Sequence, residues 1–154
     1  MDRPVLDRRG VSTAVGYVLT LSVATILISG LLVGLGGFVE DQRAGTARDE
    51  LRVIGQQIAG DLSSADRLAR VGSPIEVRVR RGLPESVTGA SYRIEVTDGA
   101  TPDDPVSVEL STENPDVTVS LGVHLDTPVV DTTLGGGDVV IRLNGVGELE
   151  VASA

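Results

Sequence analysis

Residues 11–39 have the sequence VSTAVGYVLTLSVATILISGLLVGLGGFV and contain no charged side chain. A run of more than about 18 apolar residues is typical of a membrane-spanning helix. At about 1.5 Å per residue the run would reach about 43 Å, more than the roughly 30 Å hydrocarbon core of a bilayer. The sequence therefore predicts one transmembrane helix, which either tilts or continues beyond the bilayer.

The residues on either side of this run predict its direction. The short segment MDRPVLDRRG precedes it, and Glu40 and Asp41 follow it. Arginines beside a span favour the cytoplasmic side, so we expect a cytoplasmic N-terminus and an extracellular C-terminal part in a single-pass protein of the cell membrane. A cleaved secretory signal has an apolar region of about 7–15 residues and a small-residue cleavage site after it. This run is longer and has no such site at its end, so we expect the helix to be retained.

The junction itself, RRGVSTAVG over residues 8–16, resembles the N-terminal signal of archaeal type IV pilins and pilin-like proteins. In that family a basic residue, a small residue and Val-Ser-Pro-x-x-Gly precede a long apolar helix, and a prepilin-type peptidase cuts before the helix on the cytoplasmic face. The resemblance implies a cut between Gly10 and Val11, with a processing site made of Arg9, Gly10, Val11 and Ser12. Thr13 stands where that family usually has proline. The alternative is a plain signal-anchor helix whose arginines only set the topology.

The composition is acidic, with 22 Asp and Glu residues against 13 basic ones and a net charge of −9. Every basic residue is arginine, and aromatic residues make up 2% of the chain. This composition resembles that of haloarchaeal proteins, in which surface carboxylates hold water in concentrated salt. So negative a chain argues against nucleic acid or anionic lipid headgroups as a ligand of the exported part. Cysteine is absent, which excludes disulfides and thiolate metal sites.

Two glycines of the apolar run predict a helix-packing surface. Gly30 and Gly34 are four residues apart, and a small-xxx-small pair lets two helices approach closely in lipid. We therefore expect this helix to associate with other copies or with other pilin-like subunits, as well as to contact membrane lipid.

Residues 40–70 predict an amphipathic helix that continues from the first. Apolar residues recur every three or four positions at Leu51, Ile54, Ile58, Leu62, Ala65 and Leu68. The opposite face is expected to carry Arg48, Asp49, Glu50, Arg52, Asp61, Asp66 and Arg67. Such a stripe needs an apolar partner, which the segment that follows can supply.

From residue 75 onward the apolar period changes to two, which is typical of antiparallel strands with one solvated face. The alternating apolar residues are Ile75, Val77 and Val79; Tyr92, Ile94 and Val96; Val106, Val108 and Leu110; Val117, Val119, Leu121, Val123 and Leu125; Val139, Ile141 and Leu143; then Leu149 and Val151. Turn residues separate these runs at 97–99, 114–116, 135–138 and 144–145. About six strands are expected, in a meander that forms one sheet.

The sequence thus predicts an α+β fold: a long N-terminal transmembrane helix continues into an amphipathic helix packed on an antiparallel sheet, the layout of a type IV pilin. We divide the chain into a cytoplasmic leader at 1–10, a transmembrane and assembly helix at 11–39, an amphipathic helix at 40–70 and an extracellular β domain at 71–154.

Residues that could carry chemistry are few. His124 is the only histidine and is expected on the polar side of a strand, so neither a histidine-based triad nor a His/Cys zinc site can be built within one chain. Asp98, Asp103 and Asp104 lack the regular spacing of a calcium loop and are expected to belong to an acidic turn. We expect no enzyme activity, no cofactor and no metal site.

Two functional interpretations remain. In the first, the protein is a pilin-like structural subunit that loses residues 1–10 and assembles through its apolar helix. In the second, it is a stand-alone, signal-anchored cell-surface domain that keeps those residues and binds a partner through its sheet edge or loops.

Overall fold

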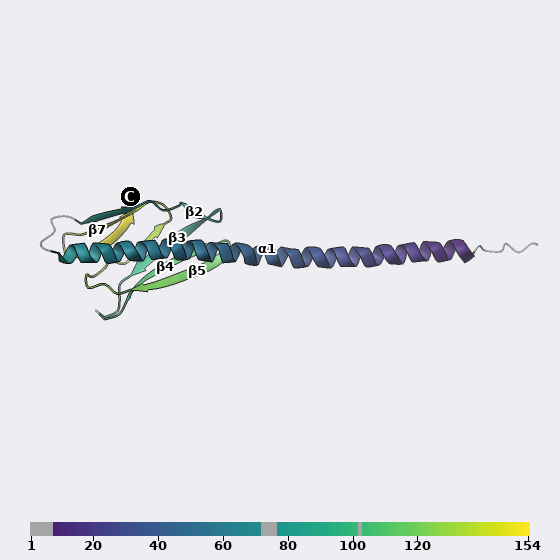
Figure 1. Ribbon diagram of the computed structural model, residues 1–154, viewed down its shortest axis with the longest axis horizontal. Helices are drawn as coiled ribbons and strands as arrows, with labels where there is room; N and C mark the ends of the chain where they lie inside the picture. The colour runs from purple at the N-terminus through teal and green to yellow at the C-terminus, as the bar shows by residue number, and fades with distance from the viewer. Residues whose placement is uncertain (1–7, 72–76, 102) are drawn as a thin grey trace, which may run out of the picture. The chain divides into compact units, whose positions relative to one another are not determined.

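The computed structural model describes residues 8–71, 77–101 and 103–154, apart from the side chains of residues 8–12 and 35. The chain divides into two compact units, Met1–Asp41 and Gln42–Ala154. A single helix, α1 (Arg8–Arg70), runs through both the predicted apolar segment and the predicted amphipathic segment (Figure 1). The strands are β1 (Arg78–Arg81), β2 (Ser86–Val87), β3 (Ala90–Thr97), β4 (Val106–Glu113), β5 (Asp116–Val123), β6 (Thr132–Gly135), β7 (Val139–Leu143) and β8 (Leu149–Ser153). The predicted α+β class is confirmed.

The amphipathic segment of α1 buries one stripe of small and aliphatic residues. The buried members are Ala47, Leu51, Ile54, Ile58, Leu62 and Ala65. Leu68 was predicted in this stripe but is 53% exposed. Leu68 follows Leu62 by two successive steps of three residues. Each step turns the helix by about 300°, about 60° short of a full turn, so the Leu68 side chain points away from the stripe.

Asp61 and Asp66 were predicted on the solvent face, and this was wrong, since both are buried. At about 100° per residue they flank the stripe, roughly 80° on one side of Leu51 and roughly 60° on the other. A carboxylate at such a margin can be buried only if a partner compensates its charge. Asp61 faces Arg81 of β1, and Asp66 faces Arg70 of the helix itself.

Gly55 brings the helix close to the sheet. A β-carbon at this position would lie 2.3 Å from Cδ1 of Leu121 and 2.9 Å from Cδ1 of Leu110. The absent side chain therefore makes room for two leucines from β5 and β4. Helix and strands share one apolar core, in which Ile58, Ile94 and Leu110 are fully buried.

The strands form two sheets rather than the single meander that was expected. One sheet has the order β1-β7-β8, and the other has the order β2-β3-β4-β5 with β6 also paired to β3. All pairs between these strands are antiparallel. β1 pairs with β7 across more than fifty residues of sequence, because all strands of the larger sheet lie between them in the chain. Residues 75 and 76 of the first predicted strand lie outside the described residues.

Two strands, β2 and β6, were not predicted. β2 joins β3 through the turn residues Thr88 and Gly89, which have φ angles of 48° and 83°. Two successive positive φ angles are typical of the tight hairpin turns that match strand twist. Threonine rarely adopts this conformation, so no turn was predicted at this position. β6 has the sequence TTLG, which is too short to show alternation.

Candidate functional site

Most of the large hydrophobic side chains that are exposed in the described part of the chain lie in the N-terminal segment of α1. Every described side chain from Thr13 to Val39 is exposed except Ala24, which is half-buried. The helix is long and apolar enough to cross a membrane. It lies near the N-terminus, as the sequence predicted.

Three hydroxyl groups of this segment are satisfied within the helix. The Oγ1 atoms of Thr20 and Thr25 donate to the carbonyls of Gly16 and Leu21, at 3.0 and 2.8 Å. Ser22 Oγ donates to the carbonyl of Val18 at 2.8 Å. A hydroxyl without a partner is costly in hydrocarbon, and a bond to the preceding turn removes that cost. These three side chains are therefore compatible with lipid.

Gly30 and Gly34 are open positions on this helix. A β-carbon added to either glycine would meet no atom within 4 Å. Their spacing of four residues puts them on one face, as predicted, where they leave a shallow strip of exposed backbone. Such a strip permits close approach of a second helix.

Of the predicted processing site, the backbone of Arg9, Gly10, Val11 and Ser12 lies in the first turns of α1. Their side chains, and residues 1–7 of the predicted leader, lie outside the described part of the chain.

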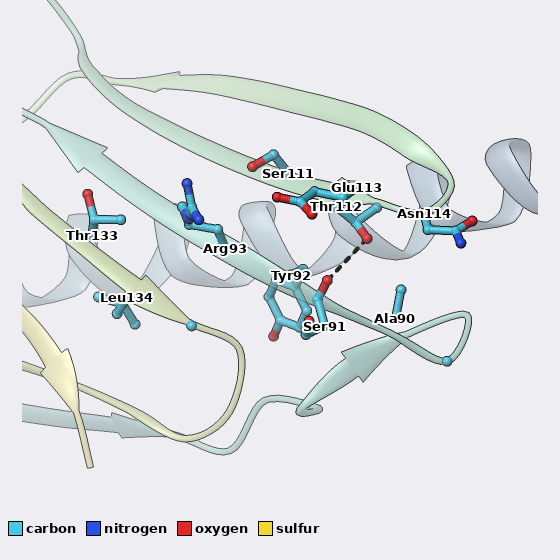
Figure 2. Close-up of a pocket in the computed structure, with 12 residues that line it drawn as sticks. Ala90, Ser91, Tyr92, Arg93, Ser111, Thr112, Glu113, Asn114, Thr133 and Leu134 are labelled. Atoms are coloured by element: carbon cyan, nitrogen blue, oxygen red, sulfur yellow. Dashed lines mark hydrogen bonds between the residues drawn. The ribbon is translucent and has the colours of Figure 1, made fainter.

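A polar hollow of about 790 Å³ lies where β3, β4 and β6 meet. Arg93 stands on β3 between Ser111 of β4 and Thr133 of β6, with Glu113 farther along β4 (Figure 2). The floor is fixed by main-chain pairing and by the hydroxyl of Thr112, which donates to the carbonyl of Ser91 at 3.1 Å. The lining side chains supply hydrogen-bonding groups. This hollow could not be predicted from the sequence, because its lining comes from three separate strands.

Tyr92 lies beside this hollow but is itself buried. Its hydroxyl donates to the carbonyl of Pro84 at 2.8 Å, and its ring covers Gly136, where a β-carbon would lie 2.4 Å from Cε1. Burial raises the pKa of the Tyr92 phenol. The residue therefore holds the segment before β2 and the turn after β6 together, and does not present its hydroxyl to a ligand.

In the acidic turn, which lacks the spacing of a calcium loop, two of the carboxylates accept hydrogen bonds from groups within the turn itself. Asp104 Oδ2 accepts from the backbone N–H and the hydroxyl of Thr101, at 3.1 and 3.0 Å. Asp98 Oδ1 accepts from the backbone N–H of Gly99 at 3.0 Å. Within the described ranges no group of three His, Cys, Asp or Glu side chains could hold a metal ion. His124 is exposed and follows the last residue of β5 rather than lying within the strand.

Two buried carboxylates of α1 link the helix to the β domain. Arg81 of β1 donates to Asp61 through Nε at 2.7 Å and through a terminal nitrogen at 2.6 Å. The hydrogen bonds and charge of Asp61 raise the pKa of Arg81. Asp66 accepts from Arg70 at 2.6 Å and from the buried backbone N–H of Thr127 at 3.0 Å. Both carboxylates therefore have a structural role, because their oxygens accept hydrogen bonds within the domain.

Comparisons with known proteins give a family but no activity. Neither a search of curated proteins nor a search of solved structures found a match. A family model matches residues 6–152, which include the apolar helix as well as the strands. The chain therefore belongs to the family described as a family of unknown function (DUF7266).

Proposed function

We propose that the protein is a non-catalytic, membrane-anchored subunit similar to a type IV pilin. Its N-terminus is cytoplasmic, its β domain is extracellular, and the apolar part of α1 serves first as a bilayer anchor and then as an assembly surface. A prepilin-type peptidase removes the leader after Gly10, and copies or other pilin-like subunits then pack against the helix.

One observation carries this proposal. A single helix has two parts with different surfaces: its described side chains from Thr13 to Val39 are mainly apolar and almost all exposed, whereas its residues from Ala47 bury an apolar stripe in the β domain. A subunit needs both surfaces, because it packs through one part of the helix and holds its exported domain with the other.

Processing is tested at the N-terminus. Mass spectrometry of the N-terminal peptide, from membranes of the native source, should find a mature chain that begins at Val11. Gly10→Leu should block the cut, because the resemblance requires a small residue before the apolar run, while Pro4→Ala should be processed normally. An intact leader on most wild-type copies would contradict the proposal and favour the unprocessed, signal-anchored surface domain.

Assembly is tested at the two glycines. Replacing both Gly30 and Gly34 with Leu should preserve membrane insertion, because leucine is more apolar, and should obstruct close helix packing. Cross-linking in intact cells should therefore fall in this double variant. The control is Val18→Leu with Val39→Leu, which adds apolar volume about 140–160° around the helix from the glycines. Equal cross-linking in all three proteins would leave the helix as an anchor only.

A further inference from the structure

The outer strands of the two sheets differ in how far they are protected from pairing with another chain. β1, an edge of the smaller sheet, has four residues, of which three are arginines. The other edge, β8, is covered by the segment before β6: Leu149 exchanges backbone hydrogen bonds of 2.8 Å with Pro128 and Val130. In the larger sheet, β2 and β6 occupy the flank of β3 that faces away from β4. Short length, charge and covering segments are the usual protections of sheet edges against pairing with another chain.

β5 carries none of these protections. It has eight residues, pairs with β4 alone and lies along one outer border of the β domain (Figure 1). From Val117 to Val123 its sequence is VTVSLGV, which contains no charged residue and no proline. None of the backbone hydrogen bonds in the described part of the chain, other than those to β4, involves this strand. Its outer N–H and C=O groups are thus an open template for one more strand.

Between Val117 and Val123 the outward side chains of β5 are small and uncharged. Thr118, Ser120 and Gly122 are exposed, while Val117, Val119 and Val123 point into the core. The chain has a net charge of −9, so most contacts between two copies would set carboxylates against carboxylates. The stretch from Val117 to Val123 is a place where two copies can meet without that repulsion.

The strand is also complementary to itself. In an antiparallel pair centred on Ser120, each residue faces the residue equally far on the other side of the centre. Ser120 then faces its own copy, Thr118 faces Gly122, and Val119 faces Leu121. At each end Asp116 faces His124, the only histidine of the chain, so that a carboxylate meets an N–H donor. Because opposite residues in antiparallel strands share one side of the sheet, both apolar faces stay on the same side.

We propose that β5 pairs antiparallel with β5 of a second copy of this chain, about a two-fold axis through Ser120. The pairing joins two five-stranded sheets into one continuous sheet. The axis stands perpendicular to the sheet, so the amphipathic segments of the two α1 helices run in opposite directions. The contact is made by the β domains alone, so it does not depend on the packing proposed for the apolar helix.

The register is tested by disulfide trapping, which suits a small interface and a chain that has no native cysteine. In the proposed pair the two Ser120 Cα atoms lie about 4.5–5.5 Å apart, within the range for a disulfide. The two Thr118 Cα atoms are four residues out of register, about 13 Å apart along the strands, and are out of range. Both side chains are exposed on the same strand, so Thr118→Cys is the matched control for Ser120→Cys.

Under mild oxidation of the detergent-solubilised full chain, Ser120→Cys should form disulfide-linked dimers about tenfold faster than Thr118→Cys, because pairing raises the effective thiol concentration. Adding the Gly30 and Gly34 to Leu replacements should leave that ratio unchanged, which separates this inference from the proposed function. Equal rates at the two positions would mean random collision, and would overturn the pairing. No dimer from Ser120→Cys would also overturn it.

A charge-swap experiment tests the same contact without a covalent bond. Ser120→Lys should abolish co-purification of two differently tagged copies at low salt, because two lysines would face each other at the axis. Mixing Ser120→Lys with Ser120→Glu copies should restore it. Failure of the mixed pair to associate while wild-type copies associate would show that the contact lies elsewhere.

Discussion

Asp66 shows how a single charged residue can hold the last turns of α1 against the β domain. Its side chain is 5% exposed, and its two oxygens accept from the guanidinium of Arg70 and from the backbone N–H of Thr127. Arg70 also pairs with Asp126, next to Thr127. The buried carboxylate therefore has a cation on one side and a main-chain donor on the other, which is the arrangement that makes burial of a charge tolerable.

Replacing Asp66 with Ala should destabilise the domain by about 1–3 kcal/mol, because the buried N–H of Thr127 loses its acceptor. The control is Asp49→Ala, at an exposed position on the same helix, where the side chain is 79% exposed and pairs only with Arg52. That change should stay within about 0.5 kcal/mol. Urea unfolding of the solubilised chain, followed by circular dichroism, measures both values. Equal losses would show that Asp66 contributes no more than a surface residue.

Tyr92 gives the domain a defined response to alkali. Burial raises its pKa, so the folded state keeps the phenol proton at a pH where the unfolded chain has lost it. Its contribution to stability is complete below the unfolded pKa of about 10 and is lost as pH rises through the folded value. The free energy of unfolding should therefore decline above about pH 10 in wild type.

In Tyr92→Phe that decline should be absent, although the variant also loses the hydrogen bond to Pro84. Tyr17→Phe should keep the decline and leaves one tyrosine, so that the ultraviolet absorbance of the phenolate reports Tyr92 alone. A midpoint at the value of an exposed tyrosine would contradict the burial seen here.

At the scale of elements, the apolar periodicity predicted the features that depend on a single segment of the sequence. It did not predict the features that depend on how two separate segments pair. The alternation around Tyr92–Val96 and Val117–Val123 predicted β3 and β5 because each strand buries one face. The partner of a strand lies elsewhere in the chain, so the separation into two sheets was not predictable. Asp61 looked like a surface residue because Arg81 lies twenty positions away. The hollow on β3 and the open edge of β5 likewise depend on which strands become neighbours.

Substitutions at Gly55 and Gly60 can distinguish the effect of helix propensity on stability from the effect of packing, because both glycines lie in α1. Gly60 is exposed, and an added β-carbon would meet nothing within 4 Å. Gly60→Ala should therefore stabilise the domain by roughly 0.5–1 kcal/mol. Gly55→Ala should forfeit that gain, because the methyl group enters the space of Leu121 and overpacking costs about 1–3 kcal/mol. Denaturant unfolding of the two variants provides the measurement. Equal stabilisation would mean that Leu121 moves aside without cost.

At the scale of the whole molecule, the two parts of the chain have different surfaces. The apolar residues of α1 provide a surface suited to lipid or to other helices, while the β domain is acidic and encloses its own core. The ion pairs of the buried carboxylates Asp61 and Asp66, together with the closely packed Gly55, make the amphipathic part of α1 an integral part of that domain.

The proposed topology predicts where the β domain can be labelled. Val146, in the turn between β7 and β8, is 84% exposed, so a cysteine placed there should react freely. With no native cysteine, Val146→Cys carries the only thiol of the chain. A membrane-impermeant maleimide should label this variant equally in intact and in lysed cells, because arginines before the span keep the N-terminus inside and place the domain outside. Wild type gives the background. Labelling that requires lysis would place the domain in the cytoplasm, and the proposal of an exported subunit would then fail.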